Sequence, residues 1–227
     1  NDLKNVTIFM ELCEKGSLDK FLEKNRKGLL EDFFDDTNRQ IILIGIARGM
    51  MYLHQRQIIH RDLKPANILL DHNLHPVLTD FGLSKYYTDN QKDSQSQQCG
   101  TTIYMAPEVF EGTHYNGKAD VYSFGIIMYE IVTGSIPYPL YQEGPMTHIQ
   151  FANKVLNENY RPKFDIKVKK PIQRLIEKCW SKNPSERPTF EELFKKLAYN
   201  FDDSLTDIYE DEPILRSQNE EEDDDEY

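Results

Sequence analysis

The clearest helical pattern runs from Thr37, the expected N-cap, to His54. Its apolar residues recur every three or four positions and so share one helix face, namely Leu43, Ile46, Ala47, Met50 and Leu53. Lys118–Thr133 is apolar on nearly every side and precedes Gly134, which predicts a buried helix that ends there. Further helices are expected from Ser17 to about Lys24, and at Met146–Asn157, Pro171–Trp180 and Thr189–Asn200.

Short apolar runs predict a few strands in the first third of the chain. Val6–Leu12 is expected to form a buried strand. Ile68–Leu70 and Val77–Thr79 are expected to pair around a turn at residues 71–73. Ser84–Gln98 is polar, so we expect a mobile loop there. The pattern as a whole predicts a mainly helical protein with a small β component.

The negative charge of the chain is concentrated at its C-terminal end. The 227 residues include 27 Lys and Arg and 38 Asp and Glu, a net charge of −11. Residues 201–227 hold 13 acidic side chains and one basic one, whereas the preceding 200 residues hold 25 acidic and 26 basic. We therefore expect a nearly neutral body and a disordered acidic tail. This balance argues against a broad basic surface for binding nucleic acid.

Cysteine usage and hydropathy indicate a cytoplasmic protein with no membrane span. The three cysteines, Cys13, Cys99 and Cys179, are widely spaced and form no pair typical of a zinc site or disulfide framework. The longest apolar stretch, Val121–Val132, is too short to cross a bilayer. The first residue is Asn1 rather than Met, which suggests a fragment of a longer chain.

Three motifs carry the candidate chemistry: His-Arg-Asp-Leu-Lys-Pro-Ala-Asn at 60–67, Asp-Phe-Gly at 80–82 and Ala-Pro-Glu at 106–108. Their order and spacing resemble the protein-kinase catalytic domain. The resemblance implies an α+β fold, the protein-kinase-like large (C-terminal) lobe, mainly α-helical, with only a remnant of the small β lobe. It divides the chain into a small-lobe remnant with the hinge at 1–16, a large lobe at 17–200 and an acidic tail at 201–227.

Phosphoryl transfer to a hydroxyl needs an in-line geometry, cations on the phosphate oxygens and an acceptor for the hydroxyl proton. Asp62 matches the acceptor, and Lys64 can place a positive charge near the transferred group. Asn67 and Asp80 offer oxygen ligands to Mg²⁺. An isolated Asp and Asn would more simply shape a turn, but the assembled motifs reverse that preference. The expected cofactors are ATP and Mg²⁺.

The motifs also bear on the substrate. Lys64-Pro65 resembles serine/threonine kinases, and so does the segment 99–106, in which Thr101 would hydrogen-bond near Asp62. The segments 179–184 and 187–190 look more like the tyrosine-kinase-like group. We therefore expect a tyrosine-kinase-like serine/threonine kinase that acts on Ser and Thr hydroxyls of proteins. Arg61 is a natural partner for a phosphate on the loop between residues 80 and 108, which implies an upstream activating kinase.

The resemblance assigns supporting roles to several residues. Glu108 and Arg187 would form a buried ion pair, Asp120 would hold the backbone of the catalytic loop, and His60 would stack on Phe81. The implied nucleotide-binding residues are Met10, Glu11, Cys13, Ser17 and Leu69. For the segment that contains Met10 and Glu11, the alternative interpretation is a plain core strand.

Several parts of a complete kinase are missing from the sequence. It contains no G-x-G-x-x-G, no Ala-x-Lys strand before the hinge-like segment and no GxxxxGK[ST] loop. The resemblance covers about residues 5–200. We expect an ATP-dependent protein serine/threonine kinase, present as a fragment that transfers phosphate weakly or not at all. The alternative is a pseudokinase or scaffold that binds protein partners without catalysis, which Asp62, Asn67 and Asp80 disfavour.

Overall fold

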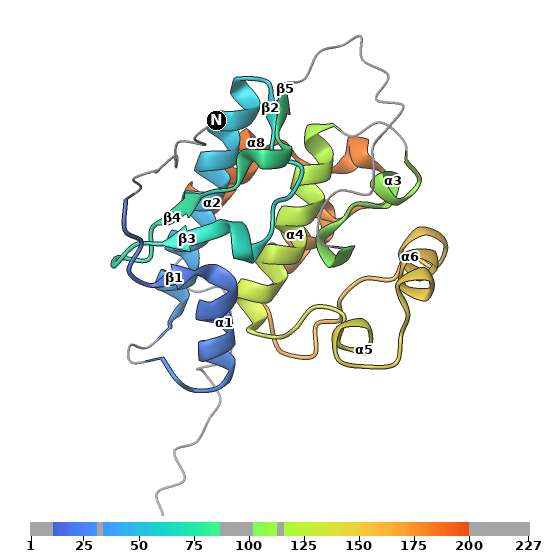
Figure 1. Ribbon diagram of the computed structural model, residues 1–227, viewed down its shortest axis with the longest axis horizontal. Helices are drawn as coiled ribbons and strands as arrows, with labels where there is room; N and C mark the ends of the chain where they lie inside the picture. Colours follow the sequence, from blue (N-terminus) through green and yellow to red (C-terminus); the bar gives the residue numbers. More distant parts are fainter. Residues whose placement is uncertain (1–10, 31–33, 87–101, 113–115, 200–227) are drawn as a thin grey trace, which may run out of the picture.

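The computed structural model describes residues 11–30, 34–86, 102–112 and 116–199, which form a mainly helical body with small antiparallel sheets on one side (Figure 1). The helices are α1 (Leu18–Arg26), α2 (Asp36–Gln55), α3 (Pro107–Phe110), α4 (Gly117–Thr133), α5 (Pro139–Gln142), α6 (His148–Asn157), α7 (Lys170–Cys179) and α8 (Phe190–Tyr199). The strands are β1 (Gly16–Ser17), β2 (Ile58–Ile59), β3 (Ile68–Leu70), β4 (Pro76–Leu78) and β5 (Lys85–Tyr86). Short 3₁₀ turns are η1 (Pro65–Asn67), η2 (Phe81–Leu83), η3 (Thr102–Tyr104) and η4 (Pro184–Glu186).

Helix α4 is the centre of the core. Every side chain from Ala119 to Val132 is buried, and α2 and α7 pack against this helix. Its N-cap, Asn116, accepts a hydrogen bond from the Lys118 amide at 2.9 Å, and the helix ends at Gly134. A helix that is apolar on all sides is stable only when other elements surround it. The expected buried helix is confirmed and begins one residue earlier than expected.

The N-cap of helix α2 lies two residues before the position that the sequence suggested. Asp35, not Thr37, is the N-cap: its Oδ1 accepts a hydrogen bond from the Asn38 amide at 2.8 Å. A carboxylate satisfies a free backbone N–H at this position and also complements the positive end of the helix dipole. Thr37 lies exposed in the first turn. The expected apolar face is buried as predicted.

The sheet of β1, β3 and β4 lies against α2 (Figure 1). All three strands are antiparallel neighbours, and β3 occupies the middle. Two glycines on α2 make this contact possible. A Cβ on Gly45 would lie 2.5 Å from the Pro76 ring, and one on Gly49 would lie 2.9 Å from Leu78 Cδ1. A side chain at Gly45 would therefore push the rigid Pro76 ring and β4 away from the helix, whereas one at Gly49 would require the Leu78 side chain to move.

Two strand predictions need correction. The polar segment expected as a loop from Ser84 begins with a strand, because β5 pairs with β2 in the register Ile58↔Tyr86. Residues 87–98 of that segment lie outside the described residues. The expected strand Val6–Leu12 lies outside them up to residue 10, and Leu12 itself is in no strand and is 79% exposed. No described residue covers the Leu12 side chain, so it is not part of the core.

The remaining boundaries differ from the predictions by one or two residues. The helix expected from Met146 begins at His148 because Thr147 forms a capping box with Gln150. The second strand of the β3–β4 hairpin is Pro76–Leu78, one residue earlier than expected, and α1 continues two residues longer than expected. In the described part of the chain no helix is long and apolar enough to span a membrane. The acidic tail lies outside the described residues.

A carboxylate near the C-terminal end of α4 is buried with two partners. Glu130 Oε1 lies 3.1 Å from Arg26 Nη1 of α1, and Glu130 Oε2 accepts a hydrogen bond from Tyr104 Oη at 3.1 Å. Burial raises the pKa of Glu130 above its usual value of 4.5, and the two partners only partly offset that effect. Ionised Glu130 therefore costs folding free energy.

We expect Glu130→Gln to remove a pH dependence from the free energy of unfolding. With a raised pKa in the folded protein, Glu130 binds its proton more tightly there than in the unfolded chain, so its contribution to stability falls as pH rises above 4.5. Gln keeps an acceptor for Tyr104 but carries no charge. The stability of this variant relative to the wild type should therefore increase with pH, as measured by denaturant unfolding across the acidic to neutral range.

Glu23→Gln is the matched control on the surface of α1. The hydrogen bond from Lys27 lowers the pKa of Glu23, so the sign of the effect is reversed. Ionised Glu23 stabilises the protein above pH 4.5, and this contribution is lost as pH falls through the lowered pKa. Relative to the wild type, Glu23→Gln should lose stability as pH rises. The same trend in both variants would contradict the environment assigned to Glu130.

Candidate active site

The loop between β2 and β3 is fastened to the first turn of α4. The fully buried Asp120 accepts hydrogen bonds from the backbone amides of His60, at 2.9 Å, and Arg61, at 3.0 Å. Arg61 has a left-handed conformation with φ of 70°, which is unfavourable for a side chain of this size. The carboxylate therefore holds the loop in a shape that the backbone alone would not adopt, and the role expected of Asp120 is confirmed.

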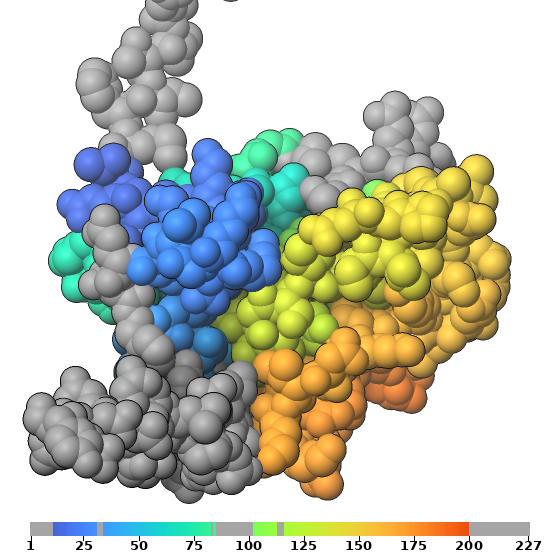
Figure 2. Space-filling model, turned by 90° about the horizontal axis from the view of Figure 1, so that it is seen from below, coloured from blue at the N-terminus to red at the C-terminus, as the bar shows by residue number. Residues whose placement is uncertain are grey.

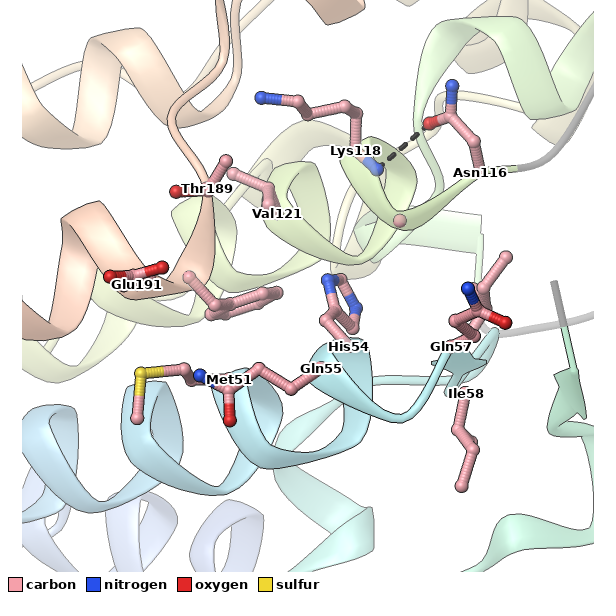
Figure 3. Close-up of a pocket in the computed structure, with 13 residues that line it drawn as sticks. Met51, His54, Gln55, Gln57, Ile58, Asn116, Lys118, Val121, Thr189 and Glu191 are labelled. Carbon is pink, nitrogen blue, oxygen red and sulfur yellow. Dashed lines mark hydrogen bonds between the residues drawn. The ribbon is translucent and has the colours of Figure 1, made fainter.

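Asp120 accepts a third hydrogen bond, from a histidine in the last turn of α2 that the sequence motifs do not indicate. His54 Nε2 donates to Asp120 Oδ2 at 2.9 Å, and its ring packs edge-on against Phe190 of α8 at 4.9 Å. Figure 3 shows His54 rising from α2 toward the first turn of α4. A histidine in the last turn of an amphipathic helix gives little local signal. Its partner lies 66 positions away.

Lys64 and Asn67 both contact the same carboxylate oxygen of Asp62. Asp62 Oδ2 lies 2.7 Å from Lys64 Nζ and accepts a hydrogen bond from Asn67 Nδ2 at 3.1 Å. The same amide nitrogen donates to the backbone oxygen of Asp62 at 2.8 Å. Asp62 and Asn67 are buried, whereas 22% of the Lys64 side chain is exposed. The carboxylate is therefore fixed in direction, with a cation at the opening of the site.

A second set of hydrogen bonds joins Asn67 to the segment before Asp80. The backbone oxygen of Asn67 accepts from the amide of Thr79 at 2.9 Å and from its hydroxyl at 3.1 Å. Asp80 follows in a left-handed conformation with φ of 59°, and its Oδ1 accepts from the Gly82 amide at 3.3 Å. Asn67 and Asp80 are thus held in adjacent segments, and the Asp80 side chain is exposed.

The donor set at Asn67 and Asp80 fits a metal ion that binds together with a phosphate. Because Asn67 directs its amide nitrogen at Asp62, its Oδ1 faces away from that carboxylate. Among the described residues, no group of three or more His, Cys, Asp or Glu side chains could hold a metal alone. Mg²⁺ is usually bound by one or two protein oxygens together with substrate phosphates and water. The amide oxygen of Asn67 and the carboxylate of Asp80 would together provide the two protein ligands that such an ion needs.

His60 and Phe81 pack together beneath the site, as expected. The His60 ring is fully buried, and its centroid lies 5.4 Å from that of Phe81. Its Nε2 lies 3.2 Å from the backbone oxygen of Thr79 and so links the loop to the Asp80 segment a second time. Phe81 is 47% exposed. His60 therefore contributes packing and positioning rather than acid–base chemistry.

The expected nucleotide-binding residues are only partly brought together. Met10 lies outside the described residues, and so does Thr101 of the substrate segment. Ser17 and Leu69 are direct partners in the β1–β3 ladder. Glu11 and Cys13 precede β1, and the backbone oxygen of Cys13 accepts from the Gly16 amide at 3.0 Å. In the part of the chain described, no hydrogen bond joins Glu11 or Cys13 to the Asp62 loop.

A largely apolar cavity of about 430 Å³ lies apart from these residues. Figure 3 shows it between α2, α4 and the start of α8, with His54, Lys118 and Glu191 in its lining. Asp62 and Asp80 do not line it. This cavity is therefore not the candidate active site, although His54 borders both.

The ion pair expected between Glu108 and Arg187 is confirmed. Two nitrogens of the Arg187 guanidinium meet the two Glu108 oxygens at 2.6 and 2.8 Å, and Arg187 is 1% exposed. Arg187 also donates to the backbone oxygens of Lys118 and Ser181, both at 2.9 Å, and its guanidinium lies 5.2 Å from the Tyr122 ring centroid. The pair joins α3 to the start of α4 and to the segment before α8.

Comparisons with known proteins agree with the motifs. Residues 1–197 match the family model of the protein kinase domain. The serine/threonine-protein kinase STY17 of Arabidopsis thaliana is 36% identical over 193 residues, which cover 85% of this chain and 32% of that protein. The dual specificity protein kinase shkB of Dictyostelium discoideum is 37% identical over 194 residues, which cover 85% of this chain and 29% of that protein. With the mostly helical structure, these matches confirm the expected fold class.

We expect Glu108→Ala to lower the free energy of unfolding by about 3–5 kcal/mol, because it leaves the buried Arg187 charge without its carboxylate. Glu191→Ala is the matched control, since it breaks the exposed Glu191–Lys195 pair of α8 and should leave stability nearly unchanged. Denaturant unfolding of both variants measures the difference. Equal effects would show that the buried pair contributes no more than a surface pair.

Proposed function

The chain belongs to the protein kinase domain family, and on that premise we propose that it is an ATP-dependent serine/threonine kinase of the tyrosine-kinase-like group. The observation that carries the proposal is the convergence of Lys64 and Asn67 on Asp62 Oδ2. This arrangement supplies a fixed proton acceptor with a cation beside it, as phosphoryl transfer to a hydroxyl requires. Its substrates would be Ser and Thr hydroxyls of proteins.

Asp62 would accept the proton of the attacking hydroxyl. For this it must point in a fixed direction, and its two partners on Oδ2 provide that direction. Lys64 is close enough to interact with Asp62 and sufficiently exposed to meet a phosphoryl oxygen as well. The strained backbone at Arg61, fastened by Asp120, keeps the loop in place before a substrate arrives.

ATP would supply the phosphoryl group, and Mg²⁺ would neutralise part of the charge on its phosphates. Asn67 Oδ1 and the Asp80 carboxylate are the residues proposed to hold the metal. Met10, Glu11, Cys13, Ser17 and Leu69 are proposed as the nucleotide site. The pairing of β1 with β3 places Ser17 beside Leu69, which supports the proposal that both lie against the adenine base.

Residue choice supports serine and threonine as acceptors. Lys64 and Pro65 follow Asp62 in the manner typical of serine/threonine kinases, and Thr101 is proposed to help shape the acceptor site. The relatives include a serine/threonine kinase and a dual specificity kinase by name, so tyrosine is the acceptor that a test must address. A cytoplasmic location and an upstream activating kinase are further parts of the proposal.

The chain spans 32% and 29% of the length of the two relatives named above, so the activity of a whole protein is itself proposed. The sequence contains neither the glycine-rich loop nor the Ala-x-Lys strand that contact phosphates in the family. We propose that residues 1–16 act as small-lobe remnant and hinge, 17–200 as large lobe and 201–227 as a tail. On this basis the 227 residues alone should transfer phosphate slowly.

We expect Asp62→Asn to reduce kcat about 100-fold or more, because Asn cannot accept the hydroxyl proton. The assay uses Mg-ATP and a general protein substrate, with this chain and with a form extended by upstream coding sequence. Asp71→Asn is the control, since Asp71 only shapes the turn between β3 and β4. Absence of Asp62-dependent transfer from the extended form would support the pseudokinase or scaffold interpretation instead.

Phosphoamino-acid analysis of the products tests the acceptor. We expect phosphoserine and phosphothreonine to account for nearly all incorporated phosphate, with the Asp62→Asn protein as the blank. Substantial phosphotyrosine that disappears in this blank would show dual specificity and would overturn the assignment to serine and threonine alone.

A further inference from the structure

Positive charge is concentrated on α7 and the segments that flank it. Residues 161–182 hold eight basic and two acidic side chains. The rest of the first 200 residues holds 18 basic and 23 acidic side chains, so its balance is negative. Figure 2 shows the orange segment, which includes α7, at the surface of the body. The nearly neutral body therefore includes a basic region at residues 161–182, which offsets the negative balance of the rest.

The helical register of α7 places its cations on the solvent side. Its apolar residues, among them Ile172 and Ile176, are buried on the side that packs against α4. The cations Lys170, Arg174 and Lys178 recur every four residues and are exposed, and the exposed Lys182 follows the helix. We call these four residues the α7 basic face. Among the described residues none of the four has a carboxylate within ion-pair distance.

A groove of about 1020 Å³ runs beside the α7 basic face. Four cations line it, and only two carboxylates do. One wall is Arg161, which donates to the Trp180 backbone oxygen at 2.9 Å while its Nη2 is buried without a hydrogen-bond partner. The guanidinium lies 5.1 Å from the Tyr122 ring centroid. The shape and charge of this groove fit an extended acidic peptide.

We propose that the acidic tail of this chain, residues 201–227, binds to the α7 basic face. The tail has 13 acidic side chains, seven of them consecutive at Glu220–Glu226, and one basic side chain. It follows directly after α8, which ends at Tyr199. Twenty extended residues reach about 66 Å, which exceeds the roughly 35–40 Å diameter of a body of this size. The tail is therefore long enough to reach the face.

Charge makes this contact selective within the molecule, because the tail is repelled by the net negative remainder of the body. Each exposed ion pair contributes little alone, but several carboxylates face several cations here. The attraction acts over a Debye length of about 8 Å at physiological salt, so it requires close contact and weakens as salt is added. Binding of the tail to the α7 basic face does not require phosphoryl transfer.

The test uses the full chain and carbodiimide coupling, which forms an amide between a carboxylate and a lysine that touch. The reporters are Lys182, which belongs to the face, and the exposed Lys163 and Lys167, which precede α7 in the sequence. Mass spectrometry measures their amides with tail carboxylates. We expect strong coupling at about 0.01 M salt and its loss at about 1 M, where the Debye length falls from ~30 to ~3 Å. Coupling that is equal at Lys20 and Lys24 of α1 would overturn the proposal.

A charge-reversal variant and its control separate the face from general electrostatics. Lys170→Glu, Arg174→Glu and Lys178→Glu together should reduce coupling at the reporters at least about threefold. Lys20→Glu, Lys24→Glu and Arg48→Glu make the same charge change on exposed positions of α1 and α2 and should leave it within about twofold. Unchanged coupling in the first variant, or equal loss in both, would refute binding to the α7 basic face.

A second variant leaves the folded body untouched. Replacing Glu220–Glu226 by their amides should reduce coupling of the remaining tail carboxylates, such as Asp202 and Asp207, to the same reporters. The decrease reports the loss of docking by the acidic run, because these earlier carboxylates are still able to react. Retention of full coupling would contradict the proposal regardless of how the charge-reversal variants fold.

Discussion

The buried carboxylate of Asp120 is the interaction on which the candidate active site depends. It collects two backbone amides of the loop, from His60 and Arg61, and the ring nitrogen of His54. A charge without solvent would be costly, and these three donors offset that cost. These contacts hold Arg61 in a left-handed conformation, which costs about 1–3 kcal/mol of backbone strain. The loop therefore presents Asp62 at a fixed place. The geometry of the loop between β2 and β3 is thus set by the first turn of the core helix.

Apolar periodicity located the long helices because burial decides where they lie, and α2 and α4 show this directly. The ends of helices were less predictable because they depend on which side chain satisfies the free amides. Thr37 and Asp35 are both good N-caps, and only the structure shows that Asp35 serves. Strand β5 was missed because its two residues are held by pairing with β2, and that distant partner leaves no pattern in the local sequence.

The motifs identified Asp62, Asn67 and Asp80 as candidates, and the buried ion pair of Glu108 with Arg187 followed from the same resemblance. They did not reveal that Lys64 and Asn67 share one oxygen of Asp62, which is a matter of side-chain direction. Nor did they reveal His54, whose importance comes from a partner far along the chain. Sequence spacing therefore pointed to the candidate residues, whereas the hydrogen bonds that orient them depend on side-chain directions that only the fold determines.

The all-round burial of α4 has a consequence for how the protein is made. Its surface is covered by α2, which precedes it, and by α7, which is completed only at Cys179. While the ribosome is still adding the residues between, one apolar side of the finished helix has no partner. Arg187, which closes the pair with Glu108, is added later still. The apolar surface of α4 is therefore fully covered only after synthesis has passed Arg187, and until then the nascent chain is exposed to aggregation.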